Sequence, residues 1–160
     1  MSATIRVDGV KETIASLKQI DPELRKTFNR QVKEIAKPII TAAQSRYRSQ
    51  NFPSGTARAW NQRGRPIFPL DTQKAVRGVT AQISTSRRSA STIAVVQKNA
   101  GAAVFEFAAS GNLGAAFSSK NGAPARVMWP AADSAQNAVS QEMARYVEEV
   151  SDMINKELSL

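Results

Sequence analysis

The chain has 160 residues, no cysteine, no histidine and a formal net charge of +9 at pH 7. Without cysteine it has no disulfides, thiolate nucleophiles or cysteine metal ligands, and without histidine it lacks the usual general base at neutral pH. Its length is typical of one domain, so we expect a single domain over residues 1–160. No apolar run of about 18 residues is present and the first residues lack a signal-peptide core, which favours folding in a cytoplasm.

The charge is unevenly placed along the chain. The net charge is +5 in residues 1–50, +7 in residues 51–100 and −3 in residues 101–160. A basic middle followed by an acidic last third can steer nucleic acid, or it can help identical subunits meet head to side.

The first half of the chain predicts a short strand over residues 4–7, a short helix over residues 10–20 and one long amphipathic helix over residues 21–48. Apolar residues in the long helix recur every three or four positions, which draws one apolar stripe. Asp21 can cap its first free amides. Pro38 cannot donate to the carbonyl of Glu34, so we expect the helix to bend or split there.

The second half predicts a β-hairpin over residues 79–97, two more short strands and a second long helix that ends near Leu158. Residues 79–84 alternate apolar and polar side chains, and the extra strands are expected at residues 104–107 and 126–129. The predicted fold class is α+β. We expect an antiparallel sheet of about four short strands packed against the long helix of the N-terminal half and the long C-terminal helix.

Two loops stand out in this arrangement. Residues 49–73 are rich in arginine and proline, which predicts a flexible loop with a functional role. Residues 110–123 are rich in glycine, which predicts a second mobile loop.

Cationic side chains and one aromatic ring gather in the segments expected to be flexible. Such residues can contact phosphates and stack on exposed bases, but a subunit interface or plain solvation explains the same residues and is favoured over nucleic-acid contact. No helix-turn-helix, zinc-finger or RNA-binding pattern accompanies them, so sequence-specific recognition is not expected. The candidate interface or DNA-facing residues are Arg58, Trp60, Arg63, Arg65, Arg77, Arg87 and Arg88.

No group of residues predicts catalysis. Glu106 lies between two aromatic residues of an expected strand and should point away from the face that the rings share. Asp133 is expected to cap or complement a helix start. The glycines form no phosphate-binding fingerprint. We therefore predict a protein that is not an enzyme, with no catalytic, metal or cofactor site, although a small carboxylate-metal hydrolase is formally left open.

Two segments resemble a known family. Residues 103–108, with Phe105, Glu106 and Phe107, look like a short strand that ends in an acidic-aromatic step. Residues 124–133 look like a strand between prolines that enters a helix, with Pro124, Trp129, Pro130 and Asp133. Together with the opening of the chain, they resemble the neck and tail-completion proteins of long-tailed bacteriophages, which are minor tail proteins at the head–tail joint. The arginine- and proline-rich insert after residue 56 and the alanines after Phe107 depart from the family pattern.

The resemblance implies a structural protein of the virion. Copies would form a hexameric or dodecameric ring that joins the capsid connector to the tail tube, after folding in the host cytoplasm. Neighbouring neck and tail proteins would be partners, and packaged DNA in the channel could be contacted without sequence preference. No membrane partner is implied. A tail terminator protein of the same particle and a non-specific nucleic-acid-binding module are the alternatives.

Overall fold

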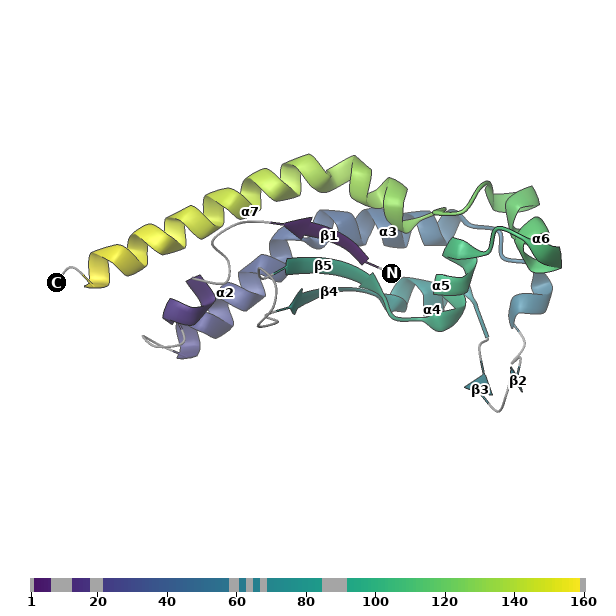
Figure 1. Ribbon diagram of the computed structural model, residues 1–160, viewed down its shortest axis with the longest axis horizontal. Helices are drawn as coiled ribbons and strands as arrows, with labels where there is room; N and C mark the ends of the chain where they lie inside the picture. Colours follow the sequence, from purple (N-terminus) through teal and green to yellow (C-terminus); the bar gives the residue numbers. More distant parts are fainter. Residues whose placement is uncertain are drawn as a thin grey trace.

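The computed structural model describes residues 2–6, 13–17, 22–57, 61–62, 65–66, 69–84 and 92–158. In this part of the chain the protein is mainly helical, with a three-stranded sheet and a separate two-stranded ribbon (Figure 1). Residues 13–17 are helical as well. The remaining elements are α2 (Pro22–Ile35), α3 (Lys37–Ser49), a 3₁₀ helix (Ser54–Ala57), α4 (Thr72–Gly78), α5 (Ala100–Phe107), α6 (Gly111–Asn121) and α7 (Met128–Leu158).

The sheet contains three antiparallel strands. Its order is β1 (Ser2–Arg6), β5 (Thr92–Gln97) and β4 (Val79–Ser84), so β4 is an edge strand. Val79 lies opposite Gln97 and Ile83 opposite Ile93, which confirms the predicted pairing of residues 79–84 with residues 92–97. A separate two-stranded ribbon joins β2 (Asn61–Gln62) to β3 (Arg65–Pro66) within the predicted loop 49–73.

The long helix predicted over residues 21–48 exists as two pieces. The break lies at Ala36, between α2 and α3, and Pro38 stands in the first turn of α3. Since proline has no amide proton, the bond back to Glu34 cannot form and the helix divides there, as predicted. The stripe is confirmed, because Phe28, Val32 and Ile39 are fully buried.

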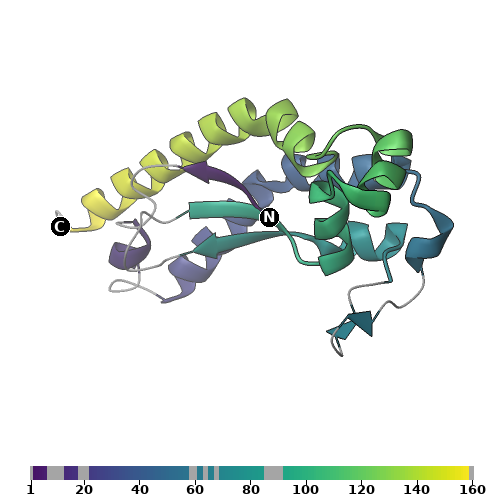
Figure 2. The same ribbon diagram turned by 45° about the vertical axis from the view of Figure 1, so that its right-hand side comes forward.

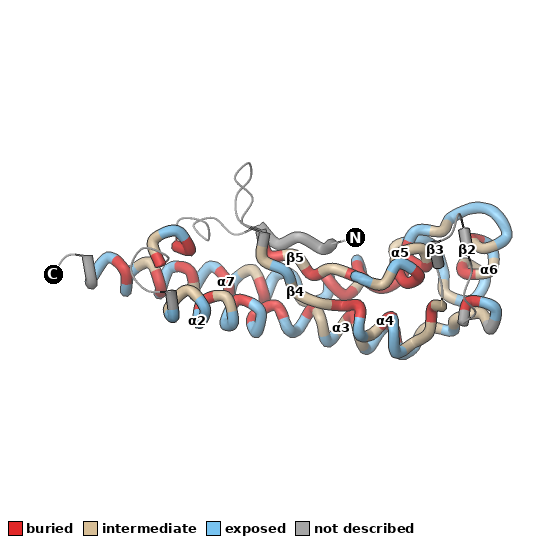
Figure 3. The backbone as a smooth tube through the Cα atoms, turned by 90° about the horizontal axis from the view of Figure 1, so that it is seen from below, coloured by how far each residue is buried: buried red, intermediate tan, exposed pale blue. Residues whose placement is uncertain are grey.

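Helix α7 runs antiparallel to α3, and the two helices lie side by side along the body of the molecule (Figures 1 and 2). Figure 3 shows that buried residues recur along the inner faces of both helices and along β5. Buried residues recur along α7 from Met128 to Ile154, and they include Ala131, Val139, Met143 and Val150.

The predicted fold class is wrong. The main sheet of the described residues has three strands, not about four, and neither of the two extra strands is present. Residues 104–107 belong to α5, whereas Arg126 and Val127 precede α7 and the helix begins at Met128. Both are short apolar runs, for which periodicity does not distinguish a strand from a buried helix. The mobile loop predicted over residues 110–123 is also wrong, because α6 occupies most of it.

Candidate functional site

A buried carboxylate holds the start of α7. The side chain of Glu106 is fully buried. Its oxygens accept hydrogen bonds from the backbone amides of Val127 at 3.2 Å and Met128 at 3.3 Å. The first amides of a helix have no partner within the helix and carry partial positive charge. Glu106 therefore caps α7 from a different helix, α5.

Tyr47 of α3 forms a third hydrogen bond with the Glu106 carboxylate. Its hydroxyl donates to Glu106 at 2.9 Å, and both side chains are fully buried. Burial, followed by the nearby charge of Glu106, raises the pKa of Tyr47 far above its ordinary value. The phenol thus keeps its proton, which the carboxylate needs as a donor. Three helices, α3, α5 and α7, meet at this one carboxylate.

The side chain of Arg126, which lies two residues before α7, binds backbone carbonyls of α5 and of the segments that flank α6. Its guanidinium donates to the carbonyl oxygens of Gly122 at 3.0 Å and Ala108 at 3.0 Å, and also to the carbonyl of Phe105. It lies 5.2 Å from the centroid of the Phe105 ring, a cation–π distance. Burial lowers the pKa of Arg126, and the charge of Glu106 opposes that shift. The direction in which α7 leaves the α5–α6 end is therefore fixed by a satisfied polar cluster.

The two helical rods carry opposite charge on their outer surfaces. Helices α2 and α3 contain seven lysines and arginines against two glutamates. Both glutamates are used locally, because Glu23 pairs with Lys26 and Glu34 with Lys37. The unpaired cations of α2 and α3 thus give this rod a basic surface.

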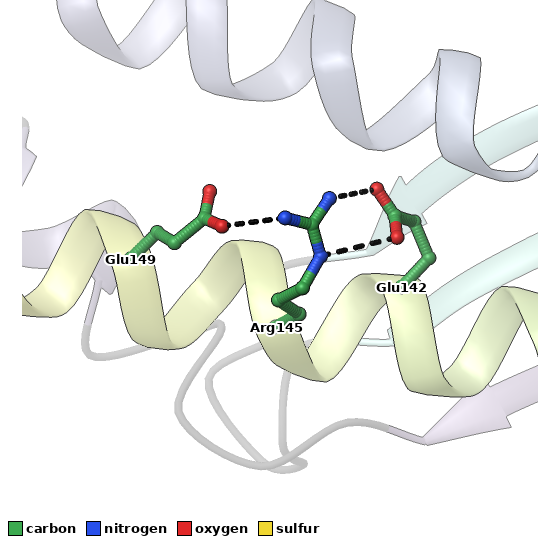
Figure 4. Close-up of polar contacts among 3 residues, drawn as sticks. All are labelled: Glu142, Arg145 and Glu149. Carbon is green, nitrogen blue, oxygen red and sulfur yellow. Dashed lines mark hydrogen bonds and ion pairs between the residues drawn. The ribbon is translucent and has the colours of Figure 1, made fainter.

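Helix α7 is the acidic rod, with six carboxylates against two cations. One cation, Arg145, is held between Glu142 at 2.6 Å and Glu149 at 2.7 Å (Figure 4). Hydrogen bonding from Arg145 lowers the pKa of Glu142, so that carboxylate stays charged. Glu148 and Asp152 are exposed and have no ion pair with another described residue.

A concave site lies between α2 and the edge strand β4, and we call it the basic groove. Its volume is about 540 Å³, and no carboxylate is among its described lining residues. The Nε of Arg25 and the Oδ1 of Asn29 are buried there without a hydrogen-bond partner. The lining residues are Ile14, Arg25, Asn29, Lys33, Ala81, Gln82, Ile83 and Lys98.

The basic groove is not predicted from the sequence, although three of its residues follow a regular spacing. Arg25, Asn29 and Lys33 recur every four residues, which places them along one edge of α2. That spacing was visible. What the sequence could not indicate was that this edge would face β4.

The predicted basic residues are not brought together by the described part of the structure. Arg77 is exposed in the last turn of α4, and the backbone of Arg65 lies in β3. The other predictions, Arg58, Trp60, Arg63, Arg87 and Arg88, fall outside the described residues. Their role as an interface or DNA-facing group stays a prediction.

The family-like segments have a different geometry from the one expected. Phe105 and Glu106 are both buried, whereas Phe107 is 54% exposed, because these residues lie on a helix. Asp133 does not cap α7, since the helix begins five residues earlier and its start is held by Glu106. Of the remaining family-like residues, Pro124 is exposed, Trp129 is 44% exposed and Pro130 is half-buried.

Two further observations concern the described residues alone. They contain no group of three or more histidine, cysteine, aspartate or glutamate side chains placed to hold a metal ion. None of their helices has the length and apolar character needed to cross a bilayer. Comparison of the chain with protein-family models, curated proteins and solved structures finds no match.

Proposed function

We propose that this chain is a structural subunit of the neck of a long-tailed bacteriophage. Its copies form a ring that joins the capsid connector to the tail tube and completes the tail. In this proposal the protein resides in the virion at the top of the tail, and in the host cytoplasm before assembly. Its partners are other copies of itself, neighbouring neck and tail proteins and, in the channel, packaged DNA.

The observation that carries the proposal is the opposite charge of the two helical rods. A basic surface on α2 and α3 and an acidic surface on α7 belong to one molecule, in which α7 packs against both helices, so the acidic rod of one copy can meet the basic rod of the next. Such a heterologous contact generates a ring when the rotation closes. The resemblance adds to this argument, because its two segments meet through Glu106 and the amides of Val127 and Met128.

The test is the native mass of the purified chain, measured across protein concentration at low and high salt. The proposal predicts closed oligomers that weaken as salt screens the charges. Monomers at every concentration and salt would remove the support that the charge pattern gives. A tail terminator protein of the same particle would also form rings, and it is distinguished by its position in particles, on the tail tube instead of at the capsid connector.

A non-specific nucleic-acid-binding module is the second candidate, favoured by the unpaired cations of α2. It predicts an affinity for duplex DNA that falls by about 0.9 log units per log of salt for each phosphate contacted. DNA titrations at two salt concentrations separate the candidates. Tight, salt-sensitive binding by a monomer supports the module, whereas binding only by assembled rings supports the neck protein.

A further inference from the structure

We propose that the basic groove receives the C-terminal part of α7 from a neighbouring copy of this chain. The inference rests on the proposed ring function and gives it a specific contact. On α7 the contact uses four residues, Glu148, Glu149, Asp152 and Met153, which we call the acidic patch.

The groove offers a cationic wall over an apolar floor. Arg25 and Lys33 are separated by eight residues of α2, so their Cα atoms lie about 12 Å apart along one helix edge. Ile14, Ala81 and Ile83 form the apolar part of the lining. The guanidinium of Arg25 and the ammonium of Lys33 give this wall its positive charge, and no carboxylate is among the described lining residues. A fitting occupant therefore carries carboxylates beside an apolar side chain.

The acidic patch has this combination. Glu148 and Asp152 lie one turn apart on one edge of α7, and Glu149 and Met153 lie one turn apart on the next edge. Met153 is 46% exposed, an uncommon exposure for a large apolar side chain on this protein. Glu148 and Asp152 are about 6 Å apart along the axis, within reach of the long side chains of Arg25 and Lys33.

The two surfaces approach each other at one point within a copy, where the hydroxyl of Thr13, beside Ile14, lies 3.3 Å from that of Ser151, beside Asp152. However, no hydrogen bond or ion pair joins the described groove residues to the acidic patch. Figure 1 shows α7 along the upper edge of the body and β4 along its lower edge, and the C-terminal end of α7 extends beyond the other described elements in Figures 1 and 2. One copy therefore cannot fill its own groove with its own patch. A second copy displaced beyond the C-terminal end of α7 brings its groove towards the acidic patch of the first copy, which is a heterologous contact.

A nucleic acid fits the groove less well. Phosphates would pair with the charges of Arg25 and Lys33, but they would make no apolar contact with Ile14, Ala81 and Ile83. A protein surface supplies both carboxylates and apolar side chains. The test below therefore includes a measurement of duplex DNA binding, which would reveal a nucleic-acid site at the groove.

The test reverses the charge of each surface in the full chain. The groove variant carries Arg25→Glu and Lys33→Glu, and the patch variant carries Glu148→Lys and Asp152→Lys. Each variant alone places like charges across the contact, so its self-association should weaken by about tenfold or more. In an equimolar mixture the acidic groove of one variant meets the basic patch of the other. The mixture should therefore recover association, which sedimentation velocity would measure at low salt.

The matched control is Lys74→Glu with Lys120→Glu, which makes the same charge change as the groove variant on α4 and α6, outside both helical rods. It should associate like the wild-type chain. A mixture of the groove and patch variants that stays monomeric overturns the contact, as does unchanged association of either variant alone. Loss of duplex DNA binding in the groove variant, with self-association intact, overturns it in favour of a nucleic-acid site.

The same experiment can refute the groove contact and the proposed ring function independently of each other. If the wild-type chain forms rings that the groove variant forms equally well, the groove contact is wrong and the ring function survives. If the mixture recovers association but yields open chains instead of closed rings, the contact stands and the ring function falls.

Discussion

Replacement of Glu106 by glutamine tests the polar cluster that positions α7. The change keeps the size of the side chain but replaces one acceptor oxygen with an NH₂ group. The carboxylate now accepts from Tyr47 and from two backbone amides, and both of its oxygens are used. In the variant at least one buried donor would face another donor.

The expected loss follows from these contacts. A buried donor left without an acceptor costs about 1–3 kcal/mol. Removal of the negative charge from a buried helix N-terminus costs up to about 2 kcal/mol more. We therefore expect the free energy of unfolding to fall by about 3 kcal/mol. For a chain of this length the midpoint of thermal unfolding would drop by about 6–12 °C.

Urea unfolding followed by circular dichroism measures this loss directly. Glu149→Gln is the matched control, because Glu149 is exposed and its pair with Arg145 lies on the surface of α7. Exposed pairs contribute less than about 1 kcal/mol. A loss below about 1 kcal/mol for Glu106→Gln, or an equal loss for both variants, would refute the role of Glu106 as the cap of α7.

Three other predictions concern the same end of the molecule. Arg126→Lys should lower the free energy of unfolding by about 2–4 kcal/mol, because one ammonium cannot replace the guanidinium's several bonds to carbonyl oxygens, and a loss under 1 kcal/mol would contradict this. The pKa of Tyr47 is raised in the folded chain, so above about pH 10 the unfolded phenol loses its proton while the folded one keeps it. Above pH 10 the free energy of unfolding of the wild-type chain should therefore fall by about 1.4 kcal/mol per pH unit more than that of Tyr47→Phe. Urea unfolding at several pH values should show the difference between the two free energies narrowing as pH rises. A difference that stays constant would contradict the raised pKa. Gly114→Ala should cost about 1–3 kcal/mol, since its Cβ would lie 2.7 Å from a backbone carbon, whereas Gly55→Ala meets nothing within 4 Å and should be nearly neutral in thermal unfolding.

The parts of the fold that the sequence predicted are those with a long regular pattern. The stripe of α2 and α3 spans seven turns, and the break near Pro38 follows from chemistry that no tertiary contact can change. The strands at residues 79–84 and 92–97 were also predicted, because alternation over six residues is a clear signal.

The wrong predictions came from short segments whose structure depends on tertiary contacts. Residues 100–107 contain four apolar or aromatic positions in a row, yet Asn99 caps them as a helix by accepting from the amide of Ala102 at 2.8 Å. The alanine-rich start after an asparagine was an available helix signal. In α6 the glycines suggested a loop, but Gly114 is buried against the preceding backbone, where a larger residue would not fit.

Of the two candidate surfaces, the acidic one is visible in the sequence and the basic groove is not. The excess of carboxylates in the last third was visible in the sequence, and the structure places most of them on one helix. The basic groove was not predictable, because it requires α2 and β4 to lie face to face across some fifty residues of sequence. The role of Glu106 was hidden too, since an acidic residue between two phenylalanines gives no sign that it caps a helix more than twenty residues away.

The joining of heads and tails tests the central claim most directly. Filled capsids and free tails would be prepared from an infection in which this chain is not made, and purified protein would be added back. Electron microscopy would then count joined particles. We predict that the wild-type protein restores joining with a closed ring at the joint, and that the groove variant does not. Capsids and tails that stay separate with the wild-type protein in excess would contradict a role in completing the tail.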